Sequence, residues 1–456
     1  MAIDIRTSSG VLRGAQRDGH QVFLGIPYAA PPVGSLRFAA PQPAAAWTGM
    51  REAVQFGNIA PQQAARSDVQ GVIARGEQSE DCLYLNVYTP AADGGRRPVL
   101  FWIHGGGFIV GSSSETIYDG GPLATRGDVV LVSVNYRLGA LGYLYLGGHG
   151  GDAWGAAANA GQLDQIAALR WVRDNIAQFG GDPRQVTIFG ESAGSAAVCA
   201  LLAMPAARGL FARAIGQSGT ANRLGNPDTA TGTAHALLAK LGLSDANAEQ
   251  LRTLPVQAIL DAQTAISPTP LLFSPIVDGV HLPERPLQAV REGQAKDIPL
   301  LIGTNRDESK FYMNPKRSQL DADGLAQRVR AVLPHKAREA AAPLIETYRA
   351  SRASRDLPHT NNDILDAIET AARFAIPASR LADAQSAHQP ATFVYLFDWE
   401  SPAYRGTLGA CHALELSFVF GTTGVPNMDR LTGTGPAVDQ LSHQMMDAWL
   451  AFAKTG

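Results

Sequence analysis

One short motif of the chain could make a serine nucleophilic: Gly190-Glu191-Ser192-Ala193-Gly194. It follows a β-branched run at 185–189 and precedes an alanine-rich run at 195–204, so the pattern predicts a strand, a sharp turn and a helix. The glycines two residues before and after the serine would let strand and helix pass closely. Ser192 would then be exposed at the carboxyl end of a parallel sheet.

A second motif could bind the negative charge that a serine attack on a carbonyl creates. A buried-strand pattern over 98–103 leads directly into His104-Gly105-Gly106-Gly107-Phe108, which matches the HGGG type of oxyanion loop. We assign the backbone N–H groups of Gly106, Gly107 and Ala193 as the oxyanion donors. A dinucleotide-binding loop is the alternative, but its third glycine would fall at position 110, which is Val110.

A serine nucleophile also needs a histidine base and a carboxylate that orients the histidine. In this strand–turn–helix arrangement the acid and then the histidine follow the serine along the chain. A strand pattern at 298–302 is followed by the adjacent residues Asp307 and Glu308, and the pattern does not separate these two candidates. Asp278 is a third candidate that also suits a turn.

The candidate bases are the five histidines that follow Glu308: His335, His359, His388, His412 and His443. His443 falls inside a helical pattern at 438–452, where a histidine on the helix face is expected, and three others lie in polar or helical stretches. His412 follows the last clear strand pattern, 391–397, at about the place where the arrangement requires a base. We therefore favour His412.

The order of predicted elements indicates an α/β fold with a mostly parallel, doubly wound central sheet. The first hundred residues contain short β segments and turns, and strands then alternate with helices from about 98 to 217. Helical insertions at about 224–265 and 320–385 would form a cap over the active-site gorge. Because the candidate triad spans positions 192 to 412, we expect a single domain over residues 1–456.

Further segments, spread over nearly the whole length, carry a family resemblance. They include Phe23-Leu24-Gly25-Ile26-Pro27-Tyr28-Ala29, Ser79-Glu80-Asp81-Cys82-Leu83, Asn135-Tyr136-Arg137-Leu138-Gly139, Phe179-Gly180-Gly181-Asp182-Pro183, Gln217-Ser218-Gly219 and His412-Ala413-Leu414-Glu415-Leu416. With the serine motif and Asp307-Glu308, they resemble the type B carboxylesterases, the cholinesterase and carboxylesterase family of α/β-hydrolases. Within that family the chain is most similar to the bacterial para-nitrobenzyl esterases.

The resemblance implies an α/β-hydrolase fold and hydrolysis of carboxylic esters through an acyl-enzyme. It assigns Ser192 as the nucleophile, Glu308 as the acid and His412 as the base. It also places Ser218 beside the triad carboxylate, and we expect Glu191 to support the site in the same indirect way.

The resemblance also implies which segments line the acyl and alcohol sides of the pocket. The candidate residues are Phe108, Leu271, Leu272, Phe273, Phe311, Tyr312 and Met313. Because these side chains are apolar and uncharged, we expect neutral short- to medium-chain or aryl esters as substrates. An amidase or carbamate hydrolase with the same triad is the alternative. A non-catalytic binding module of this fold is more remote, since all three triad residues are present.

Composition argues against several other classes of function. The 456 residues carry a net charge of −3, which leaves no basic footprint for nucleic acid. No run approaches the roughly 20 apolar residues of a membrane span, and the first residues lack the features of a signal peptide. Three widely spaced cysteines indicate neither a disulfide framework nor a metal site. We expect a cytoplasmic prokaryotic monomer or homodimer without a cofactor or a metal.

Overall fold

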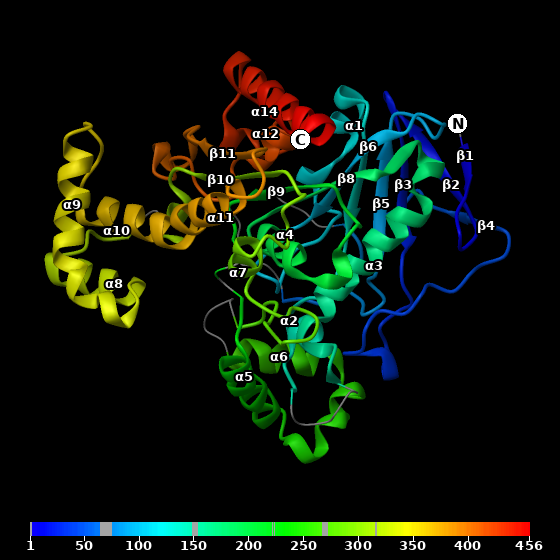
Figure 1. The fold of residues 1–456 in the computed structure, drawn as a ribbon, viewed down its shortest axis with the longest axis horizontal. Helices are drawn as coiled ribbons and strands as arrows, with labels where there is room; N and C mark the ends of the chain where they lie inside the picture. Colours follow the sequence, from blue (N-terminus) through cyan, green and yellow to red (C-terminus); the bar gives the residue numbers. More distant parts are fainter. Residues whose placement is uncertain are drawn as a thin grey trace.

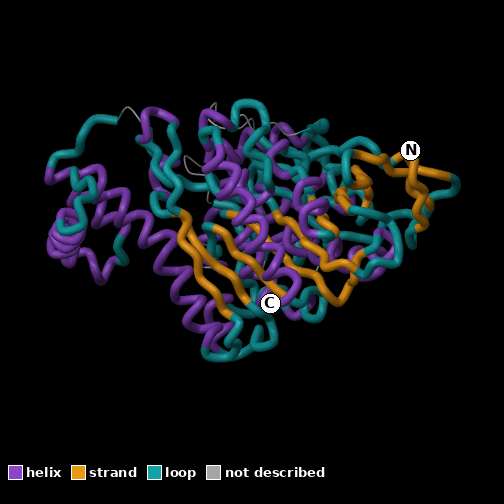
Figure 2. Tube along the Cα trace, turned by 90° about the horizontal axis from the view of Figure 1, so that it is seen from above, coloured by secondary structure: helices purple, strands orange, loops and turns teal. Residues whose placement is uncertain are grey.

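A central sheet of 11 strands organises the molecule, with helices along both of its sides (Figures 1 and 2). The computed structural model describes residues 2–63, 75–147, 154–220, 222, 224–266, 272–314 and 317–456. The strands are β1 (Ala2–Arg6), β2 (Val11–Arg17), β3 (His20–Pro27), β4 (Met50–Glu52), β5 (Tyr84–Thr89), β6 (Arg97–Ile103), β7 (Val130–Val134), β8 (Gly181–Glu191), β9 (Arg213–Gln217), β10 (Leu300–Asn305) and β11 (Thr392–Phe397).

The spatial order of the strands is β1-β2-β3-β5-β7-β6-β8-β9-β10-β11, with β4 beside β2. All neighbours from β7 to β11 run parallel, whereas β1, β2, β3, β5 and β7 pair antiparallel. The predicted mostly parallel sheet is therefore confirmed. In register, Ile103 of β6 pairs with Gly190 of β8, and Glu191 pairs with Gln217 of β9. This register brings the loops after β6, β8 and β9 to one edge of the sheet.

The helices cover both faces because the central strands are buried on both sides. Along β6, Val99, Phe101 and Ile103 belong to one apolar cluster, and Leu100 and Trp102 belong to the other. The first cluster includes α3 and α4, and the second includes α1, α12 and α14. Side chains that alternate between two buried faces are typical of a parallel sheet covered on both sides.

Most of the helices fall in the ranges that the sequence pattern indicated, whereas α7, α12 and α13 were not predicted. They are α1 (Gly121–Gly127), α2 (Gly139–Tyr143), α3 (Ala160–Asn175), α4 (Ala193–Ala203), α5 (Pro227–Lys240), α6 (Val256–Ile266), α7 (Pro286–Arg291), α8 (Ala322–Val332), α9 (Ala341–Ala353), α10 (Asn361–Thr370), α11 (Ile376–Ser386), α12 (Leu416–Phe420), α13 (Asp429–Thr432) and α14 (Pro436–Thr455). None of these helices, within the described residues, is long and apolar enough to cross a membrane.

The second helical insertion contains an arm of three helices, α8, α9 and α10, which extends away from the body on the left of Figure 1. The arm has an apolar core of its own, which includes Leu325, Val329, Ile345 and Ile364. A π-helical turn, Ala371–Ala375, continues α10 into α11. Helix α11 then packs against β10 and β11. A capping role of the two insertions over the site stays a prediction.

Candidate active site

The turn between β8 and α4 holds Ser192 in a strained backbone conformation. Its φ of 56° and ψ of −116° lie in a region that non-glycine residues rarely adopt. A Cβ added to Gly190 would lie 2.5 Å from the carbonyl carbon of Gly194, and one added to Gly194 would collide with the carbonyl oxygen of Ile103. The two glycines thus permit the close passage of strand and helix that the motif predicts.

The imidazole of His412 is paired with Glu308. His412 Nδ1 lies 2.6 Å from Glu308 Oε2, and both side chains are buried. The carboxylate comes from the short 3-10 helix Glu308–Tyr312 that follows β10, and the histidine comes from the loop before α12, 104 residues later in sequence. The parallel pairing of β10 with β9 places this acid–base pair at the same sheet edge as the Ser192 turn.

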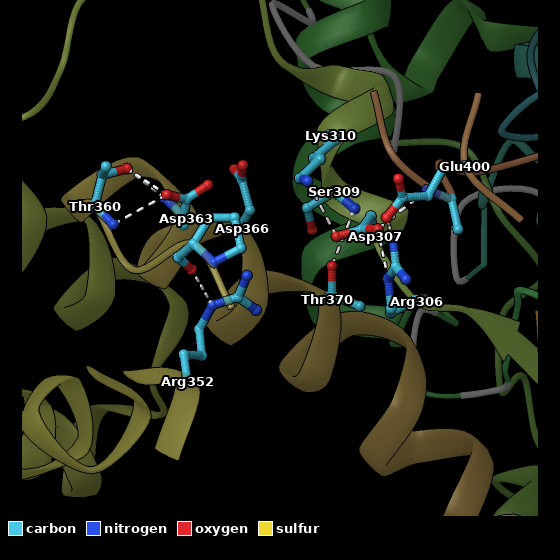
Figure 3. Close-up of polar contacts among 12 residues, drawn as sticks. Arg306, Asp307, Ser309, Lys310, Arg352, Thr360, Asp363, Asp366, Thr370 and Glu400 are labelled. Carbon is cyan, nitrogen blue, oxygen red and sulfur yellow. Dashed lines mark hydrogen bonds and ion pairs between the residues drawn. The ribbon is translucent and has the colours of Figure 1, made fainter. Parts of the chain in front are cut away.

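The neighbouring carboxylate, Asp307, has different partners (Figure 3). It accepts a hydrogen bond from Arg306 Nε at 2.9 Å and forms an ion pair with Lys310 at 3.1 Å. It also accepts the N–H of Ala410 at 3.0 Å. Asp307 therefore anchors the loop that carries His412, whereas Glu308 contacts the imidazole itself. The local pattern alone left this choice open.

Asp278 is a turn residue, as its sequence context suggested. Its Oδ1 accepts the N–H groups of Val280, His281 and Leu282 at 2.9, 2.8 and 2.9 Å. Its Oδ2 accepts a hydrogen bond from Asn159 Nδ2 at 2.9 Å. These contacts satisfy the carboxylate without involving a histidine side chain.

The second ring nitrogen of His412 faces the serine turn. His412 Nε2 lies 3.1 Å from Glu191 Oε1, and Glu191 immediately precedes Ser192. Within the described residues, Ser192 Oγ forms no hydrogen bond with His412. Catalytic hydrogen bonds are often long or poorly aligned in free enzymes and tighten when substrate binds. The imidazole thus lies beside the turn, with its Nε2 directed at Glu191, the residue next to Ser192.

Buried carboxylates determine the protonation of this site. Burial opposes protonation of His412, but the carboxylates of Glu191 and Glu308 outweigh that effect and raise the pKa of the imidazole to about 9. Burial in turn raises the pKa of Glu191 well above its ordinary value, with His412 acting in the opposite direction. Burial also raises the pKa of Glu415 to about 7, and the charge of Glu308 adds to the effect.

The glycine loop after β6 lies against the serine turn. A Cβ added to Gly105 would lie 3.3 Å from Ser192 Cβ, so the two segments are in direct contact. Gly106 and Gly107 have φ values of 100° and 64°, which suit glycine best. In the described part of the chain, the N–H groups of Gly106, Gly107 and Ala193 donate to no acceptor. These three N–H groups are therefore unoccupied, and their role as oxyanion donors stays a prediction.

His104, at the start of the loop, is not a second base. Its ring stacks on Tyr136 with centroids 4.5 Å apart and is buried. Burial lowers the pKa of His104 to about 4, so the ring is neutral at physiological pH. Its place beneath the glycine loop indicates a packing role.

Two of the predicted pocket residues contact the base. The rings of Phe311 and Tyr312 lie 5.8 and 5.3 Å from the His412 ring, centroid to centroid. Met313, which follows them, is partly buried. The apolar wall predicted after the acid is therefore next to the imidazole.

The other predicted pocket residues are more varied in their surroundings. Phe108 is buried and packs edge to face on Tyr143 at 5.1 Å. Phe273 is buried in the apolar core, and Leu272 is 38% exposed. Leu271 lies outside the described residues. Whether these residues touch a substrate stays a prediction.

Ser218 lies at the end of β9 in a strained conformation, with a φ of 52°. Its N–H donates to the carbonyl of Gly303 at 2.9 Å. Its buried Oγ has no hydrogen-bond partner among the described residues, so this structure contains no bond from Ser218 to Glu308. A role of Ser218 beside the triad carboxylate stays a prediction.

Phe374 is a site residue that the sequence pattern did not indicate. It comes from the π-helical turn between α10 and α11, is buried, and lies 5.1 Å from the His412 ring. Single π turns occur often at functional sites. No sequence pattern indicated the π-helical turn, and Phe374 is remote in sequence from every motif. With Phe311 and Tyr312, it is one of three aromatic rings that contact the His412 ring.

Comparisons with known proteins identify the family of this chain. The Carboxylesterase family profile matches residues 2–456. The para-nitrobenzyl esterase of Bacillus subtilis (strain 168) is 42% identical over 99% of this chain and 90% of its own length. The phenmedipham hydrolase of Pseudarthrobacter oxydans is 37% identical over 99% of this chain and 89% of its own length.

Solved structures give the same result. The Geobacillus stearothermophilus carboxylesterase superposes with a TM-score of 0.87 at 41% identity, covering 99% of this chain and 91% of that one. A para-nitrobenzyl esterase structure also gives a TM-score of 0.87, at 39% identity, over 99% of this chain and 90% of that one. These similarities cover nearly the whole chain. The chain has the α/β-hydrolase fold and belongs to the carboxylesterase family.

Proposed function

We propose that this carboxylesterase hydrolyses neutral short- to medium-chain or aryl esters with Ser192 as nucleophile, His412 as base and Glu308 as acid. One observation carries the proposal. A strained serine turn, three N–H groups with no acceptor among the described residues, and a buried histidine–carboxylate pair belong to loops at one edge of the sheet. This combination suits acyl transfer through a tetrahedral oxyanion.

In the first step His412, in its neutral form, takes the proton of Ser192 as Oγ attacks the ester carbonyl carbon. Glu308 accepts a hydrogen bond from Nδ1, so it fixes the tautomer that leaves Nε2 free to act as base. The N–H groups of Gly106, Gly107 and Ala193 bind the oxyanion. The C–O bond then breaks, and the alcohol leaves with the proton from Nε2.

In the second step water replaces the alcohol. His412 removes a proton from the water as its oxygen attacks the acyl carbon, and a second oxyanion forms in the same place. Its collapse breaks the bond to Ser192 Oγ, which regains its proton from His412. The acid leaves and the enzyme returns to its starting state.

Substrate preference follows from the surroundings of the base. The rings of Phe311, Tyr312 and Phe374 face the imidazole, and they carry no charge. An apolar wall of this kind favours neutral acyl or aryl groups.

We also propose that the protein is a monomer or a homodimer in a prokaryotic cytoplasm. Sedimentation velocity measures the oligomeric state.

Hydrolysis of amides or carbamates is the second candidate. It is supported by the relative that is named for phenmedipham hydrolysis. Such substrates require the same attack but a better protonated nitrogen leaving group. The test compares para-nitrophenyl acetate and butyrate with the matching anilide, an aryl carbamate and phenmedipham itself.

We expect the highest kcat/KM with the para-nitrophenyl esters. A higher kcat/KM with the anilide, the carbamate or phenmedipham would replace the ester assignment by the second candidate. A folded protein that hydrolyses none of these compounds would contradict both assignments.

A further inference from the structure

Asn305, the last residue of β10, contacts Glu308 and the loop that carries His412. Its main-chain N–H donates to Glu308 Oε1 at 2.8 Å. Its side-chain Nδ2 donates to the carbonyl of Cys411, the residue before His412, at 2.7 Å. The same Nδ2 donates to Glu415 Oε2 at 2.6 Å. One buried residue thus touches the acid, the loop that carries the base, and a further carboxylate.

Glu415, three residues after His412, is itself held on both oxygens. Its Oε1 accepts a hydrogen bond from Gln217 Nε2 at 3.2 Å, and Gln217 Oε1 accepts one from Trp449 Nε1 at 3.0 Å. An indole N–H can only donate, so it fixes which end of the Gln217 amide faces Glu415. The directions of these hydrogen bonds are therefore set from Trp449 through to Asn305.

Within the described residues, the side-chain amide of Asn305 forms hydrogen bonds only through its nitrogen, Nδ2. Its Oδ1 is buried and has no hydrogen-bond partner among the described residues. A buried oxygen without a partner costs free energy. The oxygen therefore does not explain why an amide occupies this position. The two bonds that Nδ2 makes are what an apolar side chain could not supply.

We propose that Asn305 is a positioning residue for the catalytic base, acting with Glu415. By binding the Cys411 carbonyl and the Glu415 carboxylate, it fixes the loop on both sides of His412 while its main chain fixes Glu308. The imidazole is thereby held in line with the acid. The proposal rests on the proposed function, because it assumes that His412 is the base.

A merely structural role is the alternative, and it makes different predictions. If Asn305 only helps to join β10 to the His412 loop, its loss lowers stability without changing the rate of each folded enzyme. If it positions the base, the rate falls even where folding is intact, because small misplacements of a catalytic group cost about 10²-fold.

The first variant is Asn305→Ala, which removes both side-chain hydrogen bonds without adding a charge. We expect kcat for para-nitrophenyl acetate to fall about 10²-fold, with little change in KM. The rate at which an organophosphate labels Ser192 should fall by a similar factor, to the same final stoichiometry. The matched control is Asn175→Ala, which also removes two hydrogen bonds of a buried asparagine, to Ser8 and Trp171.

The second variant reverses a hydrogen bond. Glu415→Gln alone replaces one of two acceptor oxygens by an NH2 group, which then faces the donor of Asn305 or of Gln217, so kcat should fall. In Asn305→Asp/Glu415→Gln the new glutamine can donate to the new aspartate, and the number of carboxylates is restored. We expect kcat of the double variant to exceed that of Glu415→Gln, although the Cys411 carbonyl stays without its donor.

The pH profile adds a readout that a structural role would not move. The ionisable groups around Glu415 are Glu308, Glu191, Tyr395, Cys411 and His412. Glu415 is one of the carboxylates that raise the pKa of His412. Glu415→Gln should therefore move the acid limb of kcat/KM to lower pH, and the double variant should move it back.

The outcomes separate this inference from the proposed function. If wild-type Ser192 is not labelled at all, the proposed function fails whatever Asn305 does. If the wild type is labelled and Asn305→Ala reacts and turns over at the same rate, the positioning role is wrong. If the double variant recovers thermal stability but not kcat, Asn305 is only structural. If Asn305→Ala does not fold, kcat of Glu415→Gln is compared with kcat of the double variant. A higher kcat of the double variant supports the positioning role, and an equal kcat contradicts it.

Discussion

Two buried charge clusters of this chain are built in opposite ways. In the first, Arg137 donates to Asp164 through Nε at 2.8 Å and through a second guanidinium nitrogen at 2.7 Å, and another nitrogen donates to the carbonyl of Ala39. One cation meets one anion. In the second, a single imidazole, that of His412, faces Glu308 at 2.6 Å and Glu191 at 3.1 Å.

The difference shows how a buried charge can serve structure or chemistry. A balanced pair with all its partners in place fixes two segments of chain, and removal of one partner leaves a costly unpaired charge. An excess of carboxylates instead changes proton affinities, which is what a general base requires. The Arg137 pair is therefore expected to control stability, and the His412 cluster to control rate and its pH dependence.

The largest effect on rate should come from removal of the imidazole. His412→Ala leaves Ser192 without a base, so we expect kcat to fall about 10⁶-fold, as when one member of a tightly coupled triad is lost. The matched control is His443→Ala, an exposed histidine on α14. If kcat of His412→Ala were only a few factors of ten below that of the wild type, this histidine would be excluded as the base.

The largest effect on stability should come from the balanced cluster. Asp164→Ala leaves the buried guanidinium of Arg137 unpaired, and we expect the free energy of unfolding to fall by about 3–5 kcal/mol. Urea denaturation followed by fluorescence measures it, and kcat for each folded molecule should change far less. A loss below about 1 kcal/mol would mean that the two clusters do not divide their roles in this way.

Removal of one excess carboxylate should change the pH profile. His412 must be neutral to accept the Ser192 proton, so kcat/KM of the wild type should rise with pH through the pKa of His412, about 9. The charge of Glu191 helps to raise that pKa, so Glu191→Gln should move the acid limb to lower pH by about 1 unit. An unmoved limb would show that Glu191 does not act on the base.

The smallest effect should come from an exposed ion pair that belongs to neither cluster. Arg126 and Asp447 are joined by two hydrogen bonds of 2.7 Å, with side chains that are 34% and 57% exposed. Asp447→Ala should lower the free energy of unfolding by at most about 1 kcal/mol, because water and salt screen such pairs. A loss as large as that of Asp164→Ala would remove the distinction between buried and exposed pairs.

The sequence predicted those parts of the site that depend on local pattern. The turn at Ser192 and the glycine loop each follow a strand directly, and the strand–turn–helix pattern around Ser192 is contained within residues 185–204. The strands and helices around them were placed within a few residues for the same reason. The exposed position of His443 also agrees with the helical pattern around it.

Contacts between distant segments could not be predicted in the same way. Asp307 and Glu308 are adjacent, and only the packing of the loop against Arg306, Lys310 and Ala410 decides which of them turns toward the histidine. Asn305 and Glu415 meet across 110 residues of chain, and nothing local marks either as part of the site. Their pairing depends on how the His412 loop packs against the end of β10.

The most direct test of the account is intact-mass spectrometry and peptide mapping after treatment with an organophosphate, on the wild type and on Ser192→Ala. We predict a single adduct on Ser192 of the wild type, with loss of turnover of para-nitrophenyl acetate in step with labelling, and no adduct on the variant. A folded wild type that forms no adduct, or an adduct that persists in Ser192→Ala, would contradict the assignment of Ser192 as the activated nucleophile.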